Sequence, residues 1–480
     1  MSNYKMERSL KTRHVSMIAI GGAIGTGLFV ATGGVISQAG PGGAILAYAI
    51  IGVMLYFLMN AVGELSSAYP LSGAFSAFAT RFIHPSFGFV LGWLYIAICI
   101  LVASVDIVVT ANVISFWEWS QFLSPLEWSI AFFLLIFLLN IFTVRAYGEA
   151  EYWLSFIKVF MIIVFVILGF LMIFGILGGH TYGFENFTYK EAPFVGGISG
   201  FVGVLLIAGF SVGGTEQVAI TAGESEDPSK SMPKAVNQVF WRILLFYIGS
   251  IVVISAIIPY NDPLLLNESG SVLQSPFTIV FNRIGISFAA SVINAVILTS
   301  LLSAANSMLY TTSRLFYSLA ESGQAPKILA KINKKTRAPL ISVIVTCAVI
   351  LGVVIFANYN DGAVFYILNL LGALVLIIWF SNIWAMFRVR KAIKLQDKNM
   401  DEILPYKAKG YPYGQYIVVA ILLFLFIGSG ATNIIDYNPT GLVNHFLPYV
   451  VLLVIFLVHK WVTKSKLVDL NKVDLTQKDG

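Results

Sequence analysis

Apolar residues along this chain gather into long runs that are separated by short polar segments. A run of about 20 apolar residues is what an α-helix needs to cross the hydrocarbon core of a bilayer. The pattern predicts twelve such helices, near residues 15–38, 43–64, 87–116, 127–145, 150–177, 197–222, 239–259, 276–305, 339–357, 362–387, 413–432 and 443–462. We therefore predict an all-α, polytopic membrane protein with twelve transmembrane helices.

Glycine interrupts two of these runs in their middle, at residues 21–27 (GGAIGTG) in the first span and 209–216 (GFSVGGTE) in the sixth. A glycine in a helix interior costs up to ~1 kcal/mol relative to alanine, so both runs predict a break in the helix. Non-helical backbone inside a bilayer is tolerated only where it is buried in protein or lines a cavity. Two such breaks in two halves of a chain are typical of a transporter's substrate site. The alternative for the first run is a helix-packing face, because Gly21 and Gly25 satisfy the GxxxG pattern.

The two breaks are expected to present opposite helix ends to the middle of the membrane. The half-helix after the first break begins near Gly25, and its free N–H groups and positive dipole end would bind a carboxylate. The half-helix before the second break ends near Gly209, and its unpaired carbonyls before Ser211 would bind an ammonium group. The residues concerned are Ile24, Gly25, Thr26, Gly27, Gly209, Phe210 and Ser211. This pair of sites predicts a zwitterionic α-amino acid as the ligand.

The composition supports a membrane protein, because 58% of the 480 residues are hydrophobic and 11% are charged, whereas a soluble domain carries about 25% charged residues. The net charge of +6 is explained by topology rather than by nucleic acid. With the N-terminus inside, all but three of the 30 Lys and Arg residues fall in or beside cytoplasmic segments, and Lys190 alone lies in an external loop. We predict cytoplasmic termini at 1–14 and 463–480, a single transporter domain over 15–462 with its first helix retained, and solvated cytoplasmic loops.

Charged residues inside the predicted spans are candidates for function, since each costs about 3 kcal/mol or more unless it is paired or hydrated. Glu216 follows the second break and is expected to face the cavity; the alternative is a satisfied structural carboxylate. Lys158 lies too deep to reach the interface, and it would suit proton coupling or a fixed ion pair with a carboxylate. Asp106 and Glu224 are further candidates, while Glu64 at the inner end of the second span is expected to be structural and hydrated.

Other kinds of chemistry find no support in the sequence. The five histidines lie in loops or at helix ends, and Cys99 and Cys347 lie in apolar segments without disulfide or metal spacing. The HExxH, GxSxG and Walker motifs do not occur. We therefore expect no enzymatic activity, no cofactor, no metal, no nucleic acid and no obligatory protein partner. The expected partners are a free amino acid, a proton and membrane lipid.

Several strings of the sequence resemble one family as a set. They are MIAIGGAIGTGLFVATGGVISQAGPGGA, GELSSAYPLSGAFSAFATRFIHPSFGFVLGW, RAYGEAEYWLSFIKV, GGTEQVAITAGESEDPSKSMPKAV and LLSAANSMLYTTSRLFYSLAESGQAPK. They are similar to bacterial amino-acid permeases of the amino acid–polyamine–organocation superfamily, and the similarity covers spans one to ten in order. Within the family, the fifth span and the stretch GESEDPSKSMPKAVNQVFWRILLFY are most similar to the lysine-specific members.

The resemblance implies a fold and a mechanism. The fold would have two inverted repeats of five spans, at 15–177 and 197–387, with discontinuous helices one and six and two extra helices over 413–462. The mechanism would be amino acid–proton symport by alternating access in the cell membrane. By the same resemblance, Gly25, Thr26 and Gly27 hold the carboxylate and Phe210 covers the substrate. Glu216 contacts its side chain or couples the proton, and Lys158 takes the place of a sodium ion.

The third span departs from the family pattern. Relatives usually carry an aromatic, Asn-containing run after Gly92-Trp93, and this chain keeps only Tyr95 from it. Tyr95 is therefore a candidate substrate contact. A cationic substrate (lysine, arginine or histidine) is favoured, and a neutral or aromatic amino acid is the alternative. An amino-acid exchanger and a transport-derived sensor also stay open.

Overall fold

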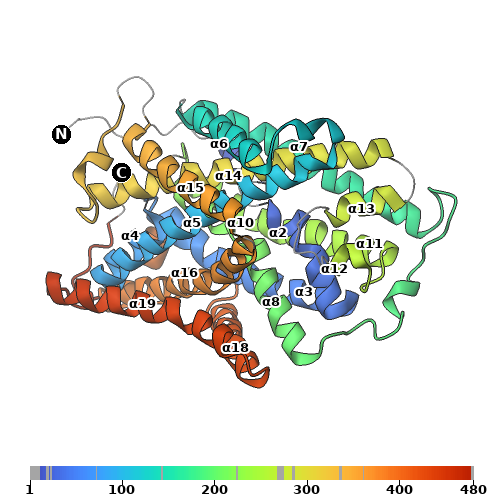
Figure 1. Cartoon of the computed structure of the whole chain (residues 1–480). Coiled ribbons are helices and arrows are strands. Elements are labelled where there is room, and N and C mark those ends of the chain that lie inside the picture. The colour runs from blue at the N-terminus through green and yellow to red at the C-terminus, as the bar shows by residue number, and fades with distance from the viewer. Residues whose placement is uncertain are drawn as a thin grey trace.

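The computed structural model describes residues 11–17, 21, 24–71, 73–141, 144–222, 225–266, 275–283, 287–333, 338–360 and 362–476. Its elements are helices joined by turns (Figure 1). In the first half of the chain they are α1 (Thr12–Met17), α2 (Thr26–Phe29), α3 (Ala31–Ala68), α4 (Ala74–Phe82), α5 (Pro85–Val113), α6 (Pro125–Ile141), α7 (Val144–Ile173), α8 (Gly197–Val212), α9 (Val218–Thr221) and α10 (Pro228–Arg242). The second half contains α11 (Gly249–Ile257), α12 (Pro263–Leu266), α13 (Pro276–Arg283), α14 (Ser287–Glu321), α15 (Leu340–Tyr359), α16 (Ala363–Leu395), α17 (Met400–Ile403), α18 (Tyr413–Ile435) and α19 (Pro439–Thr463).

Long apolar helices dominate the fold. Among the described residues, ten helical stretches of at least 18 residues are apolar enough to cross a membrane, where α8 with the turns up to Ile220 counts as one stretch and α10 with α11 as another, and α6 supplies a shorter apolar helix. The prediction of an all-helical, multi-pass membrane protein is thus confirmed. The first two predicted spans meet within α3, where only a kink separates them. At this kink Gly40 has φ +71°, and a Cβ there would lie 2.6 Å from the carbonyl oxygen of Pro193, so the position requires glycine.

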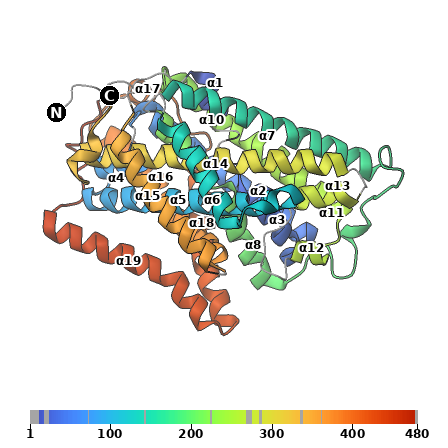
Figure 2. The same cartoon turned by 45° about the horizontal axis from the view of Figure 1, so that its top comes forward.

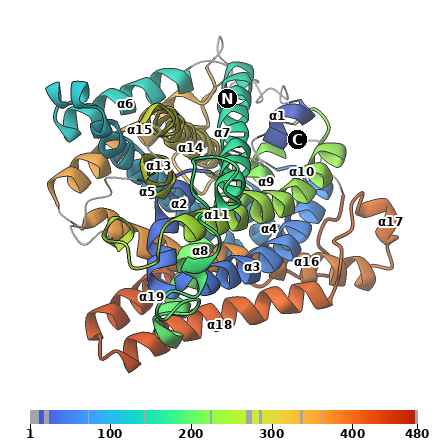
Figure 3. The ribbon, with the colours of Figure 1, turned by 90° about the vertical axis from the view of Figure 1, so that its right-hand side faces the viewer.

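The short helix α2 lies at the centre of the molecule in all three views (Figures 1, 2 and 3). It packs against α5 and α8, which come from distant parts of the chain. The helix α7 runs along one edge in Figures 1 and 2, and α18 and α19 run along the opposite edge. Many apolar side chains of α19 are exposed, including Leu453, Val454 and Leu457, as expected of a helix that faces lipid. The polar backbone at the start of α2 is therefore far from the lipid-facing edges.

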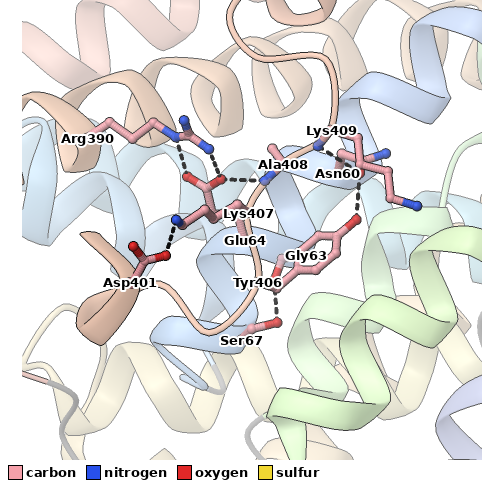
Figure 4. Close-up of polar contacts among 10 residues, drawn as sticks. All are labelled: Asn60, Gly63, Glu64, Ser67, Arg390, Asp401, Tyr406, Lys407, Ala408 and Lys409. Atoms are coloured by element: carbon pink, nitrogen blue, oxygen red, sulfur yellow. Dashed lines mark hydrogen bonds and ion pairs between the residues drawn. The ribbon is translucent and has the colours of Figure 1, made fainter. Parts of the chain in front are cut away.

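A buried ion pair joins the end of α3 to α16. Glu64 is fully buried, and Arg390 donates to its two oxygens from Nε (2.8 Å) and Nη2 (2.5 Å) (Figure 4). The backbone N–H of Ala408 also donates to Glu64, at 2.6 Å. One turn earlier, Asn60 accepts hydrogen bonds from the Tyr406 hydroxyl and the Lys409 N–H. The prediction of a hydrated Glu64 is wrong, because the loop before α18 folds over this carboxylate and supplies its partners.

The chain after α19 also differs from the solvated tail that the sequence predicts. Residues 464–476 lie against the ends of α4, α5 and α16, and Leu470, Val473 and Leu475 are buried there. Backbone outside helices leaves carbonyls that need donors. Arg388 and Gln396 of α16 and Arg81 of α4 donate to carbonyls of this segment, at Val468, Leu470, Val473, Asp474 and Thr476. The stretch between α3 and α5 forms the helix α4, whose apolar side chains Phe75, Phe78 and Phe82 are buried.

The Glu64–Arg390 pair generates a stability prediction. We expect Arg390→Met to destabilise the protein by about 3–5 kcal/mol, because it leaves a buried carboxylate without its countercharge. The double variant Glu64→Gln/Arg390→Met should recover most of the loss, since the amide is neutral and can still accept from Ala408. Thermal unfolding in detergent measures both. Equal melting temperatures for the single and double variants would contradict this role of the pair.

Candidate functional site

The first break lies between α1 and α2. Gly25 has φ −149° and ψ −138°, which is not helical, and the new helix begins at Thr26. Asp106 of α5 accepts hydrogen bonds from the Thr26 hydroxyl (2.6 Å) and the Thr26 N–H (3.4 Å). On the other side of the break, Lys158 of α7 donates to the carbonyl of Ile24 at 3.4 Å. A carboxylate thus accepts from the N–H group at the start of α2, as a helix N-terminus prefers, and an ammonium donates to the carbonyl of the non-helical residue before Gly25.

The second break begins after α8. The sequence prediction that this half-helix ends near Gly209 is wrong by three residues, because α8 continues to Val212. The chain leaves the helix at Gly213 and Gly214, where Gly214 has φ +80°, and Thr215–Gln217 form a short 3-10 turn. A left-handed backbone favours glycine, so the Gly-Gly pair ends the helix.

The last carbonyls of α8 already accept hydrogen bonds. The Gly213 N–H donates to Phe210 (2.9 Å), the Tyr247 hydroxyl donates to Ser211 (2.7 Å), and Arg242 Nη2 donates to Val212 (3.3 Å). Because Gly213 N–H bonds Phe210, it does not make the helical bond to Gly209. The buried guanidinium of Arg242 places a positive charge at the negative end of the helix. A carbonyl can accept a second hydrogen bond, so a substrate ammonium at this helix end stays a prediction.

The two broken helices touch each other at Gly27 and Ser211. A Cβ at Gly27 would lie 2.4 Å from the Ser211 Cα and 2.9 Å from its carbonyl oxygen, and the Ser211 hydroxyl donates to the Gly27 carbonyl at 3.0 Å. Gly21 approaches Ser155 of α7, and Gly25 approaches Ala304 of α14, just as closely. The first glycine run therefore both breaks the helix and packs closely against other helices, so the packing alternative and the predicted break apply to the same residues.

A cavity of about 50 Å³ lies where the breaks meet, which is room for a few water molecules. Among the described residues that line it, only Asp106 and Glu216 are charged. The Tyr95 hydroxyl donates to Glu216 Oε1 at 3.2 Å. The lining is Gly25, Thr26, Gly27, Tyr95, Ile98, Val102, Asp106, Phe210, Ser211, Gly213, Gly214, Glu216, Ala304, Met308, Leu371 and Val375.

Most of the site residues expected from the sequence come together in this lining. Three do not line it. Ile24 and Lys158 are buried behind it, where they bond each other, and Gly209 faces the Trp379 ring. Glu224 lies outside the described residues. No group of three or more His, Cys, Asp or Glu suited to a metal occurs in the part of the chain that the structure describes.

Sequence reasoning missed the apolar wall of the cavity and two buried charges. Ile98 and Val102 lie on the face of α5 that carries Tyr95 and Asp106, and their spacing of three or four residues was a usable signal. Met308, Leu371 and Val375 carry no signal, because nothing distinguishes them from other apolar residues of their helices. The missed charges are Arg242, described above, and Glu151, which lies seven residues before Lys158 on α7.

An all-helical, multi-pass membrane protein with a central cavity that holds two carboxylates at two helix breaks belongs to the class of membrane transport proteins. The particular family follows from comparison with known sequences, since the model of the amino acid permease family matches residues 14–472. The chain belongs to this family, so its function is amino-acid transport, and the resemblance drawn from the sequence is confirmed.

Individual relatives match over nearly the whole chain. The lysine-specific permease LysP of Lactococcus lactis subsp. cremoris (strain MG1363) is 43% identical over 98% of this chain and 93% of its own length. The histidine permease HisP of the same strain is 43% identical over 98% of both chains. The lysine-specific permease LysP of Escherichia coli (strain K12) is 42% identical over 99% of this chain and 97% of its own length.

The contact between the breaks generates a prediction. Gly27→Ala should lower stability by about 1–3 kcal/mol and weaken substrate binding, because the methyl group meets backbone atoms of Ser211 that cannot rotate away. Gly34→Ala is the matched control, since a Cβ there meets only the flexible end of Gln38 at 4.0 Å. Thermal unfolding and binding of a radiolabelled amino-acid substrate in detergent test the pair. Wild-type behaviour of both variants would contradict the contact.

Proposed function

We propose that this permease takes up a cationic L-amino acid (lysine, arginine or histidine) together with a proton, by alternating access. The observation that carries the proposal is the cavity, where a helix N-terminus lies beside two carboxylates and no described lining residue is basic. A substrate with one carboxylate and two cationic groups complements this arrangement. Because the cavity has room only for a few water molecules, its walls must move apart to admit the substrate.

The substrate carboxylate would bind at Gly25, Thr26 and Gly27, as the family resemblance implies. In the described structure Asp106 occupies the Thr26 hydroxyl and N–H. Two carboxylates at one site repel each other unless one of them carries a proton. Binding of the substrate at Thr26 would therefore favour protonation of Asp106, and this would couple substrate binding to proton binding. Phe210 and Ser211 line the opposite wall and would cover the substrate.

The cationic groups of the substrate have two acceptors. Glu216 lies on the second break and is held by the Tyr95 hydroxyl, so it would receive the cationic side chain. The carbonyls that end α8, from Gly209 to Ser211, would receive the α-ammonium. Lys158 stays behind the cavity, where it would take the place of a sodium ion and take part in proton coupling. Glu216 is the other coupling candidate from the sequence.

A neutral or aromatic amino acid is the alternative substrate. The apolar wall of Ile98, Val102, Leu371 and Val375 favours it, and a gamma-aminobutyric acid permease of Bacillus subtilis (strain 168) is 38% identical over 86% of this chain. Obligate exchange of amino acids is the alternative mechanism.

We further propose twelve spans in two inverted repeats of five, over 15–177 and 197–387, with two extra helices over 413–462. The first span would be made of α1, α2 and the start of α3, and the extra helices would be α18 and α19. The basic residues Arg388 and Arg390 of α16 and Arg81 of α4 gather near the ends of α3 and α4 and the segment that follows α19, so we assign this side to the cytoplasm. The termini at 1–14 and 463–480 would lie there, and the protein in the cell membrane.

Uptake of radiolabelled L-lysine into proteoliposomes tests the substrate and the coupling. We expect accumulation driven by an inward proton gradient, its collapse when a protonophore is added, and competition by lysine and arginine in a panel of the twenty amino acids. Uptake that needs internal amino acid and ignores the gradient would indicate exchange instead. Competition by neutral amino acids alone would overturn the cationic assignment.

The variant Asp106→Asn tests the coupling at the first break. The amide can still accept from the Thr26 hydroxyl but cannot carry the proton. We expect it to retain exchange of lysine between equal internal and external pools and to lose gradient-driven accumulation. Thr26→Ser keeps the hydroxyl donor and should behave like the wild type. Full accumulation by Asp106→Asn would remove Asp106 from the coupling mechanism.

A further inference from the structure

Glu151 and Lys158 lie on the same face of α7, two turns and about 10 Å apart along its axis. Both side chains are completely buried. The Lys158 Nζ lies 3.9 Å from Glu151 Oε1, which is too long for a direct hydrogen bond. A buried ion pair that served stability alone would be expected to close this gap, because desolvation of the charges is offset only by good geometry.

A hydroxyl group fills the gap. Ser303 of α14 accepts a hydrogen bond from Lys158 Nζ at 2.9 Å and donates one to Glu151 Oε1 at 2.6 Å. The three groups form a continuous chain of donors and acceptors from ammonium to carboxylate. Along such a chain a proton can pass from the ammonium to the carboxylate while the nitrogen and oxygen atoms stay close to their positions.

The second oxygen of Glu151 is unusual. Ser155 and Ser303 both donate to Oε1, whereas Oε2 is buried and has no hydrogen-bond partner in the part of the chain that the structure describes. An ionised carboxylate with one bare oxygen is costly inside a protein. Glu151 therefore has one oxygen that is bonded to Ser303 and a second oxygen that the described residues leave without a hydrogen-bond donor.

We propose that Glu151, bridged by Ser303, is the proton acceptor for Lys158 in the transport cycle. The proposal rests on the proton coupling proposed above. In this step the Lys158 ammonium gives a proton to Ser303 Oγ while the Ser303 hydroxyl gives its own proton to Glu151. The ion pair becomes a neutral amine and a neutral carboxylic acid, so the total charge is unchanged. Glu151 then releases the proton to water on the cytoplasmic side, and Lys158 regains one from the side of the cavity.

The transfer would act on the first helix break through Lys158. The ammonium donates to the Ile24 carbonyl, and a charged donor makes a stronger hydrogen bond than a neutral amine. The other charged groups that act on Lys158 are Asp106 of α5 and Arg242 of α10. Proton transfer therefore weakens the hydrogen bond from Lys158 to the Ile24 carbonyl, on one side of Gly25. The hydrogen bonds from Thr26 to Asp106, on the other side of Gly25, remain. Proton release and movement of the first span are thereby linked.

Two transport measurements separate this role from a structural one. The first is accumulation of radiolabelled L-lysine driven by an inward proton gradient, and the second is exchange between equal lysine pools without a gradient. Glu151→Gln keeps the acceptor for Ser303 but cannot take the proton, and Ser303→Ala removes the bridge. We expect both variants to retain exchange and to accumulate no more lysine with the gradient than without it. Glu151→Asp should restore part of the accumulation.

Ser155→Ala is the matched control, because Ser155 donates to the same Glu151 oxygen at 3.3 Å without being bonded to Lys158. It should accumulate lysine like the wild type. Gradient-driven accumulation by Ser303→Ala or Glu151→Gln at the wild-type level would overturn the relay. Should Glu151→Gln fail to fold, Ser303→Ala alone tests the relay. Loss of both exchange and accumulation in folded Ser303→Ala would also contradict the relay. If the wild type itself ignores the gradient, the proposed proton coupling fails instead.

Discussion

Backbone groups that a broken helix leaves unpaired inside a membrane must find partners within the protein, and the centre of this structure is arranged around that requirement. At the first break the partners are Asp106 for the Thr26 N–H and Lys158 for the Ile24 carbonyl. At the second, Arg242 serves the end of α8. Asp106 at the start of α2 and Arg242 at the end of α8 each have the charge that the dipole of the helix end prefers. The need for these partners explains why charged residues are buried on α5, α7 and α10.

The same requirement connects stability with transport. A side chain that bonds the free backbone groups of a break in the absence of substrate occupies a position that a substrate would use. Substrate binding therefore replaces the side chain as the hydrogen-bond partner of those backbone groups. In this account Asp106 gives way to the substrate carboxylate or accepts a proton, and Lys158 can pass its proton through Ser303 to Glu151. The close contact of Gly27 with Ser211 holds the two breaks against each other. A small change in protonation can therefore bear on both broken helices.

Much of this arrangement could be predicted from the sequence. Runs of apolar residues predict the long helices, and the glycine runs predict where the helices break, because both signals are local. The polar residues Tyr95, Asp106 and Glu216 stand out within apolar spans, and the structure brings them to one cavity. Family membership, but not the identity of the substrate, follows from the motifs.

The rest depends on contacts between distant segments. The end of α8 could not be placed because Gly209 and the Gly213-Gly214 pair are equally good local breakers, and only the fold selects between them. Glu64 was expected to be hydrated, since nothing local shows that Arg390 and the loop before α18 would cover it. The docking of residues 464–476 likewise depends on donors that α4 and α16 supply. The bridge between Glu151 and Lys158 depends on Ser303, which comes from the distant helix α14.

The central claim is that the substrate carboxylate and Asp106 compete for Thr26, so that substrate binding brings in a proton. Calorimetric titration of the purified protein with L-lysine, repeated at one pH in buffers of different ionisation enthalpy, tests it most directly. The account predicts that the observed enthalpy changes with the buffer in the direction of proton uptake, and that this dependence disappears in Asp106→Asn. Binding of lysine with the same enthalpy in every buffer would contradict it.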